Sequence, residues 1–523
     1  MASEKVKKSS NKSTSKKTST KKSTNAKKNT SIKKKTVSKK VVITKTNEVK
    51  KVDTTIKKPI KKVETTNNKE FNFDIKKIQK SIKDFFKNIK TKFKNLSKPV
   101  KIVLIVLVIC ILIIGIEGLL VLSHKRQLEN SQVFYERYNG VSIDGDSVIV
   151  AGITDIKETM FDTNIKDNSR GKIIKYDNKG NIEFQTIYEH GIATAFNSVI
   201  TVEDGYIAVG TGIFSEEEKN NEGQEAIIVK FTKDGEIVWE KYYHVLANTS
   251  FSKVIKVEDG YIAVGQSIHA NMEVGNQTTG GAIIVKYDFN GNEVWHNNHG
   301  GTKSGNFNDV VEVEGSLYAV GKDGTDWGNI VKFSKDGKYE WHKNYSYTDG
   351  SGFMGVSYSN GYLYVVGSKK IFDTKKGDND NRTTNNTDAL FIKYDLEGNI
   401  IFEKTFGGSS FERYTGIISY HNNFYIVGHL CSDDAGLKIT NVSKETMTGL
   451  IVRYDINGNI LKKEVFGGSK NDNLTDIDTD GISFYAVGYS NSKDGNINNN
   501  SNGKDYFGKV IKLNSKFKKM YVR

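Results

Sequence analysis

Downstream of about residue 140, apolar and polar residues alternate in short runs that end at Gly, Asn or Asp. This period of two is typical of β-strands joined by turns. In each group one apolar run ends in glycine, and these glycines recur 46 to 61 residues apart: Gly152, Gly210, Gly265, Gly321, Gly367, Gly428 and Gly488. A basic residue in front of an aromatic residue or leucine follows each one: Lys175, Lys230, Lys286, Lys332, Lys393, Arg453 and Lys512. Recurrence at this interval predicts a repeat architecture.

Each repeat contains four runs with strand character, which we name strands A to D. In the second repeat they cover residues 196–202, 206–210, 226–231 and 237–243. The A–B turns carry pairs such as Asp204-Gly205, which favour tight hairpins, and the C–D turns combine Asp with Gly-Asn. No helical pattern intervenes, so the sequence predicts an all-β fold, a seven-bladed β-propeller of four-stranded antiparallel blades over residues 134–523.

The two ends of this region fit the repeat less well. The first strand A is predicted to be short, near residues 141–143, while the last repeat supplies its own strand D at residues 517–522. How the ring closes is therefore left open.

Bulky residues recur at fixed places within the repeats. Strand A carries Phe196, Phe251, Phe307, Phe353, Tyr414 and Leu474, and strand D carries Phe184, Trp239, Trp295, Trp341 and Phe402. We predict that these residues pack between blades. The basic residue of strand C has seven equivalents, which favours a scaffold role such as covering apolar surface with its aliphatic stem.

The motifs resemble a known group of proteins. A Tyr-x-Val-Gly strand at residues 425–428 and the run VKYDFNGNEVW at residues 285–295 resemble bacterial repeat propellers of cell surfaces and secreted proteins. They are more distantly similar to Kelch blades and to quinoprotein-type blades. The resemblance covers residues 134–523 and implies the propeller architecture. Kelch blades usually have a double glycine after the second strand, whereas Gly210, Gly265 and Gly367 stand alone here.

The charge is concentrated in the first hundred residues. They hold 32 of the 77 basic residues and 7 of the 61 acidic ones, a net charge of +25 within a chain of +16. Residues 1–70 consist mainly of Lys, Ser, Thr and Asn and cannot bury enough apolar surface to fold, so we expect a disordered arm. It is either a solvated tail or a polybasic partner for nucleic acid or anionic lipid.

Two apolar segments follow the arm. Residues 71–98 carry apolar residues at spacings of three and four opposite a lysine-rich face, which predicts a basic amphipathic helix that lies on anionic lipid, with a short coiled coil as the alternative. Residues 102–122 are apolar apart from Glu117 and are long enough to span a membrane. The lysine excess before them predicts a cytoplasmic N-terminus and an extracellular propeller in the plasma membrane.

Candidate sites lie in the connections between strands B and C. Their lengths vary, whereas the A–B and C–D turns are uniformly short, and insertions on one face often mark a binding surface. The candidate ligand-binding acids are Asp378, Asp380, Asp433, Asp434 and Asp494. Asp378 and Asp380 are also calcium candidates, although their spacing lacks the alternation of a calcium loop and solvated loop acids are the simpler interpretation.

No catalytic residues can be assigned from the sequence. His296 and His299 have no third ligand at a metal-binding spacing, and no nucleophile or phosphate-binding motif is present in the repeats. We therefore predict a membrane-anchored binding module for an extracellular protein or a cell-wall glycan. The alternatives are a glycan-active enzyme with carboxylates at the central channel and a passive assembly scaffold.

Overall fold

The computed structural model describes residues 97–99, 134–155, 169–215, 223–243, 248–267, 273–274, 277–278, 281–299, 305–324, 327–345, 351–371, 386–436, 446–497 and 505–523. Lys98 and Pro99 are helical. The arm, the rest of the amphipathic helix and the segment 102–122 lie outside the described residues, as do Asp378 and Asp380. Within the described part of the chain, no helix has the length and apolarity that a membrane crossing needs.

The strands form seven four-stranded antiparallel sheets and one two-stranded ribbon. Blades 1 to 3 consist of β1 (Glu136–Asp144), β2 (Ser147–Asp155), β3 (Ser169–Tyr176) and β4 (Ile182–Ile187); β5 (Ala193–Val202), β6 (Gly205–Ile213), β7 (Glu225–Thr232) and β8 (Ile237–Tyr243); and β9 (Thr249–Val257), β10 (Gly260–Ser267), β13 (Gly281–Tyr287) and β14 (Glu293–His299). The ribbon pairs β11 (Glu273–Val274) with β12 (Gln277–Thr278).

Blades 4 and 5 consist of β15 (Asn306–Val313), β16 (Ser316–Asp323), β17 (Trp327–Phe333) and β18 (Tyr339–Tyr345); and β19 (Gly352–Ser359), β20 (Tyr362–Lys370), β21 (Thr387–Tyr394) and β22 (Ile400–Phe406). Blades 6 and 7 consist of β23 (Glu412–Tyr420), β24 (Asn423–Leu430), β25 (Thr448–Asp455) and β26 (Ile460–Phe466); and β27 (Asp472–Thr479), β28 (Ser483–Ser490), β29 (Phe507–Asn514) and β30 (Lys519–Val522).

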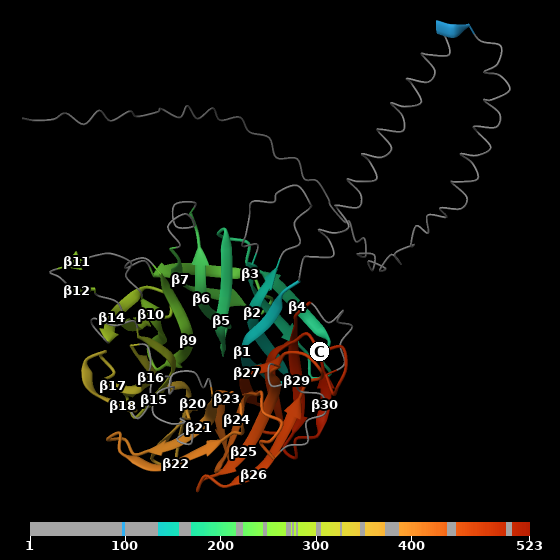
Figure 1. The fold of residues 1–523 in the computed structure, drawn as a ribbon. Helices are drawn as coiled ribbons and strands as arrows, with labels where there is room; N and C mark the ends of the chain where they lie inside the picture. Colours follow the sequence, from blue (N-terminus) through green and yellow to red (C-terminus); the bar gives the residue numbers. More distant parts are fainter. Residues whose placement is uncertain are drawn as a thin grey trace, which may run out of the picture. The chain divides into compact units, whose positions relative to one another are not determined.

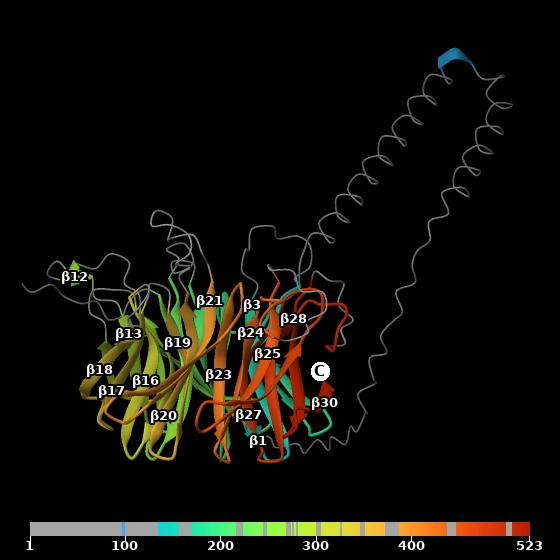
Figure 2. The ribbon, with the colours of Figure 1, turned by 60° about the horizontal axis from the view of Figure 1, so that its bottom comes forward.

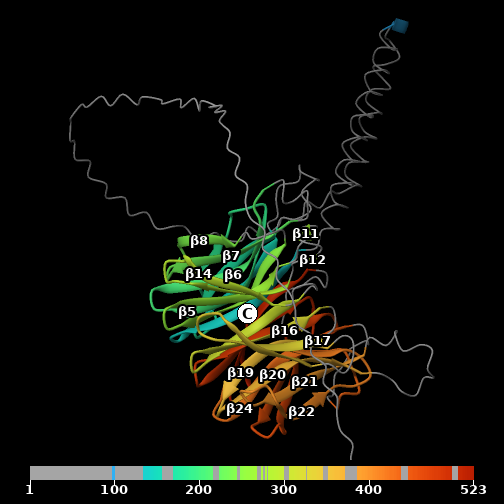
Figure 3. The ribbon, with the colours of Figure 1, turned by 90° about the vertical axis from the view of Figure 1, so that its left-hand side faces the viewer.

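The blades stand around a central channel as the sequence predicts. The first strand of each blade lies nearest the axis and the fourth lies at the rim (Figure 1). The A–B and C–D turns share one face, at the bottom of Figure 2, and the B–C connections start from the other, which we call the B–C face. Figure 3 shows blade 5 beside β24 of blade 6, so that neighbouring sheets pack face to face.

The predicted seven-bladed propeller is confirmed, and so are the strand positions in blade 2, where β8 has the predicted bounds. Two expectations about the ends are wrong. The first strand of blade 1 is not shortened, because β1 runs over Glu136–Asp144. The last strand β30 begins at Lys519, two residues later than predicted, because Phe517 belongs to the C–D turn with a φ of 60°.

The repeated glycine has a steric cause. In every blade this glycine is the register partner of the bulky residue of strand A, as Gly210 is of Phe196. The register between strands A and B shifts directly beside this pair, as at a β-bulge. A Cβ atom at Gly210 would lie 1.9 Å from the carbonyl oxygen of Ala195, and the corresponding distance is 1.9 to 2.1 Å for all seven glycines. No other residue fits, because the bulge pushes a backbone carbonyl into the space of the side chain.

The hydrophobic core lies between the blades. The buried residues form seven clusters, and each one combines residues of two neighbouring blades. The predicted packing residues of strand A belong to these clusters; Phe196, Phe251 and Phe307, for example, are fully buried. The cluster that contains Tyr138 and Val487 joins blade 1 to blade 7, so apolar contacts also close the ring.

The bulky residues of strand D pack against the C–D turn of the next blade. A Cβ atom at Gly291 would lie 2.9 Å from the ring of Trp239, and Gly337 faces Trp295 in the same way. This confirms the predicted packing. Blade 6 has Lys462 in place of the aromatic residue, and the turn of blade 7 has Phe517 in place of glycine, so that a cation–π contact of 5.5 Å replaces the ring-on-glycine contact.

In blades 1 to 3 the basic residue of strand C anchors the A–B turn of its own blade. Lys230 pairs with Asp204 and Lys286 with Asp259, each at 2.7 Å, and Lys175 pairs with Asp144 at 2.8 Å. In blade 5 the Nζ atom of Lys393 lies 3.7 Å above the ring of Tyr362. The predicted scaffold role is confirmed, with the charged head as well as the stem taking part.

The ring closes without exchange of strands between the first and last blades. Each of these blades is built from one continuous segment, and the segment before β1 forms a parallel bridge between Tyr135 and Tyr506. Glu136 N donates to Tyr506 O at 3.0 Å, as Thr249 N does to Gln224 O at the seam between blades 2 and 3. The closing seam between blades 7 and 1 therefore uses the same kind of backbone hydrogen bond as the seam between two blades that follow each other in the chain.

Candidate functional site in the central channel

The first strands enclose a cavity of about 570 Å³ on the axis of the propeller. All seven blades contribute to its lining, which is mostly apolar or uncharged. The charged side chains in the lining are Lys253, Asp309, Arg413, Asp476 and Asp478, with His429 beside them.

The bulged residue of strand A binds the next blade. Asn139 Nδ2 donates to Phe196 O and Asn197 Nδ2 to Phe251 O, both at 2.8 Å. At the closing seam Thr475 Oγ1 donates to Tyr138 O at 2.7 Å. The bulge frees this side chain from its own sheet, and in blades 1, 2, 4, 6 and 7 the side chain donates to a backbone carbonyl of the next blade.

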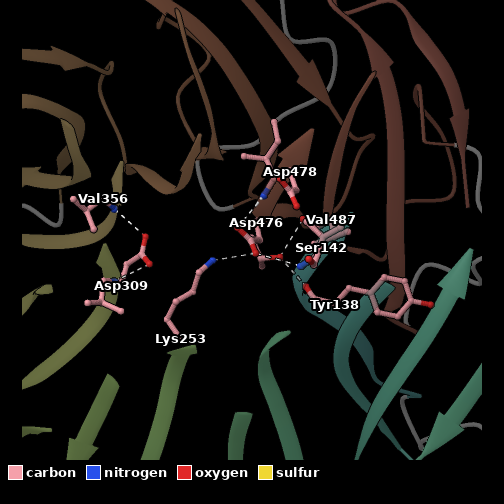
Figure 4. A network of polar contacts seen from close by, with 12 residues as sticks. Tyr138, Ser142, Lys253, Asp309, Val356, Asp476, Asp478 and Val487 are labelled. Atoms are coloured by element: carbon pink, nitrogen blue, oxygen red, sulfur yellow. Dashed lines mark hydrogen bonds and ion pairs between the residues drawn. The ribbon is translucent and has the colours of Figure 1, made fainter. Parts of the chain in front are cut away.

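The residue after the bulge is charged in three blades, and the two acids among these residues reinforce the seams. Asp309 accepts hydrogen bonds from Val310 N at 2.8 Å and from Val356 N of the next blade at 2.9 Å. Asp476 accepts from Ile477 N at 3.0 Å and from Val141 N of blade 1 at 3.2 Å. Figure 4 shows both carboxylates turned toward the neighbouring backbone.

Asp478 repeats the pattern one step farther along β27. It accepts from Thr479 N at 2.8 Å and from Ile143 N of blade 1 at 3.0 Å. Burial raises the pKa of its carboxyl to about 6, because the hydrogen bonds only partly offset the loss of hydration. The closing seam therefore has two carboxylates that each hold an amide of blade 1.

Lys253 is the third charged residue after a bulge and reaches across the channel. Its Nζ atom lies 3.4 Å from Oδ2 of Asp476 (Figure 4). Burial opposes the charge of Lys253, but Asp476 and Asp309 outweigh it and hold the pKa of the lysine above its usual value. Burial raises the pKa of Asp309 in spite of Lys253. The positive charge of Lys253 thus partly compensates the negative charges of the aspartates that join the blades.

These contacts show what the acids do in the described structure. Asp309, Asp476 and Asp478 use both oxygens on backbone N–H groups, one in their own strand and one in the next blade. The geometry assigns these three carboxylates to the joining of blades.

The end of the channel toward the B–C face has the opposite charge. Arg413 of β23 and His429 of β24 are register partners in an antiparallel pair, so their side chains lie on the same side of blade 6. His429 Nδ1 contacts Oδ1 of Asn473 in blade 7 at 2.9 Å. The ring of Phe411 stacks on His429 with centroids 5.3 Å apart, and the Arg413 guanidinium lies 5.0 Å from that ring.

Three of the predicted site residues, Asp433, Asp434 and Asp494, lie in the described part of the chain. Asp433 is exposed, while Asp434 Oδ1 accepts from Ser409 N at 2.8 Å and Asp494 Oδ1 from Ser469 N at 2.7 Å. Asp434 and Asp494 therefore fasten the D–A connection before their blade to the B–C segment. The described residues contain no group of three His, Cys, Asp or Glu side chains placed to hold a metal ion, and calcium binding at Asp378 and Asp380 stays a prediction.

Sequence reasoning missed Arg413 and His429. Arg413 stands directly before the bulky residue of strand A, where the other blades have Arg137, Ala195, Ser250, Asn306, Gly352 and Asn473. Alignment of the repeats would show a basic residue there in only two blades. His429 follows the marker glycine Gly428 directly, where the other blades mostly have small or polar residues. Departures from the repeat at these two places were the available signal.

Comparison with known proteins adds little to this picture. No family model and no curated protein matches the chain. Among solved structures, the β-propeller domain of the Trilobed protease from Pyrococcus furiosus is 9% identical, with 75% of this chain and 97% of that chain covered and a TM-score of 0.40. Sqt1 from Chaetomium thermophilum is 10% identical, with 73% and 83% covered and a TM-score of 0.39. At these values the propeller assignment rests on the strand pairing itself.

Proposed function

We propose that the chain is a membrane-anchored extracellular binding module whose B–C face takes a protein or a cell-wall glycan. The observation that carries the proposal is the division of labour in the channel. Each channel carboxylate holds a backbone N–H group of the next blade, whereas near the B–C face Arg413 Nε and His429 Nε2 have no hydrogen-bond partner among the described residues. A cavity with convergent polar groups is the usual form of a ligand site.

The difference between the two faces supports the same proposal. The C–D turns are closed by their own side chains; Asp288 Oδ1 accepts from Asn290 N and Asn292 N, each at 2.8 Å, and Asp395 and Asp455 do the same in their blades. Such turns leave few polar groups for a partner. The B–C connections differ in length and sequence from blade to blade, which suits a surface that recognises a specific ligand.

The location of the module follows from the sequence alone. The apolar segment 102–122 would anchor it in the plasma membrane, with the lysine-rich residues 71–98 on anionic lipid and the propeller outside. The basic arm, residues 1–70, would face the cytoplasm, where nucleic acid is a further partner that its charge suits.

The experiment is a two-part test of location and binding. In intact cells, a membrane-impermeant biotin reagent should label lysines of the propeller but not a tag at the N-terminus. Purified residues 131–523 should retain wall glycan or a surface protein in a pull-down, and the same fragment unfolded in urea should not. Labelling of the N-terminal tag, or a fragment that retains neither material, would contradict the proposal.

A further inference from the structure

Arg413 has no counter-ion in the described part of the chain. Its guanidinium contacts the ring of Phe411, and its Nε atom is buried without a hydrogen-bond partner. Burial lowers the pKa of Arg413 because no carboxylate is near enough to compensate. Arg413 as a whole is partly exposed, but a guanidinium that loses part of its hydration without gaining an anion is still costly, and proteins generally pair such a group.

His429 provides a second unused polar atom at the same place. The residue is 5% exposed, and its Nε2 atom is buried without a partner. Nδ1 lies 2.9 Å from Asn473 Oδ1, and the neutral ring tautomer that donates this hydrogen bond leaves the lone pair of Nε2 free. His429 therefore offers an acceptor where Arg413 offers donors.

We infer that the Arg413–His429 site binds a hydroxycarboxylate, the chemistry of an acidic sugar unit in a glycan. The carboxylate would pair with the guanidinium fork of Arg413, and a hydroxyl would donate to Nε2 of His429. Phosphate in its ionised form offers mainly acceptors, so it suits Arg413 but not His429. The cavity of about 570 Å³ lined by both residues has the size of sites that hold small ligands. This inference deepens the proposed binding function and rests on it.

Blade 1 provides a matched control. Arg137 occupies the position of Arg413, directly before the bulky residue of strand A, and its Nε atom is also buried without a partner. Its register partner is Ile153 instead of a histidine, and Arg137 does not line the cavity. A variant at Arg137 removes the same charge near the same face and spares the site.

The test is calorimetric titration of the full-length protein in detergent with sodium D-glucuronate, D-glucose, L-lactate and inorganic phosphate. We expect glucuronate to bind more tightly than the other three. Arg413→Gln should weaken glucuronate binding about tenfold or more, since it removes a charge-assisted pair, and Arg137→Gln should leave it unchanged. Near-ultraviolet circular dichroism should show that both variants keep the native fold, and Arg413→Lys should bind with intermediate affinity if Arg413→Gln misfolds.

Several outcomes would overturn the inference. If glucose bound as tightly as glucuronate, the carboxylate would play no part in binding. If phosphate bound as tightly as glucuronate, the hydroxyl would play none. Lactate as tight as glucuronate would retain a hydroxycarboxylate site and overturn its assignment to a sugar. Equal losses in Arg413→Gln and Arg137→Gln would show a general charge effect. If Arg413→Gln still retains wall glycan in the pull-down, the proposed function stands and this site is wrong. If glucuronate binds but the protein retains no wall material, the site stands and the proposed function is wrong.

Discussion

Removal of the Asp476 carboxylate tests whether side-chain contacts close the ring. Asp476→Ala leaves Val141 N and Ile477 N without acceptors and takes an anion away from Lys253. Each buried donor that loses its partner costs about 1–3 kcal/mol. The cost to Lys253 is limited, because its side chain is 28% exposed and can be hydrated when the anion is gone. We expect the free energy of unfolding to fall by about 2–4 kcal/mol.

The assay is urea denaturation of residues 131–523, followed by tryptophan fluorescence and by amide hydrogen exchange. Asp309→Ala is the matched variant, because it breaks the same kind of contact with Val356 at a seam where the chain itself links the blades. Exchange should accelerate in β1 and β27 in Asp476→Ala and around β15 and β19 in Asp309→Ala. A loss below about 1 kcal/mol in Asp476→Ala, or unchanged exchange in β1, would refute the reasoning.

Three further predictions concern the repeat and its titration. Gly210→Ala forces a Cβ atom to within 1.9 Å of Ala195 O and should cost about 3 kcal/mol, whereas Gly361→Ala, with a φ of 82° and open space around it, should cost about 1 kcal/mol, both measured by denaturant unfolding. Trp295→Ala exposes the turn glycine of the next blade and should lower stability by about 2 kcal/mol in the same assay. Because burial raises the pKa of Asp478 to about 6, the folded protein holds this proton more tightly than the unfolded chain, and stability should fall as pH rises from about 4 through 6. This loss in the free energy of unfolding should amount to at most about 3 kcal/mol between pH 4 and pH 7, and Asp478→Asn should abolish it. The same pH dependence in Asp478→Asn as in the unmodified protein would contradict the assignment.

The propeller architecture could be predicted from the sequence because the same pattern of strands and turns occurs seven times. The glycine of strand B has the same steric reason in all seven blades, the bulky residue of strand D faces a turn glycine in every blade but the sixth, and the basic residue of strand C binds the A–B turn in the first three blades. Periodicity also placed β8 correctly, since both its ends lie between strong turn signals. The predicted strands of blade 2 are shorter than the observed ones, since β5 begins three residues earlier and β6 ends three residues later than predicted, and in blade 7 the boundary failed at Phe517, which takes the turn position of a glycine.

The site was not predictable in the same way. Asp434 and Asp494 look like loop acids in the sequence, and only the fold shows that each reaches back to a serine N–H of the preceding connection. From the sequence, carboxylates at the channel were expected only for the alternative of a glycan-active enzyme, and the binding of backbone amides of blade 1 by Asp476 and Asp478 depends on contacts between residues 335 positions apart. Arg413 and His429 could be noticed in the sequence as departures from the repeat. That their side chains lie on the same side of blade 6 depends on the strand register, which the sequence does not show.

The bridge at the closing seam also sets how the propeller would bear mechanical load. Phe134 N donates to Asp505 Oδ1 at 2.9 Å, Tyr506 N donates to Phe134 O at 2.8 Å and Glu136 N donates to Tyr506 O at 3.0 Å. A pull on the chain ahead of Phe134 would meet these three bonds before it reached the ladder of β1. The force would therefore be shared between the first blade and the last, and the ring would resist tension through the seam that has no covalent link.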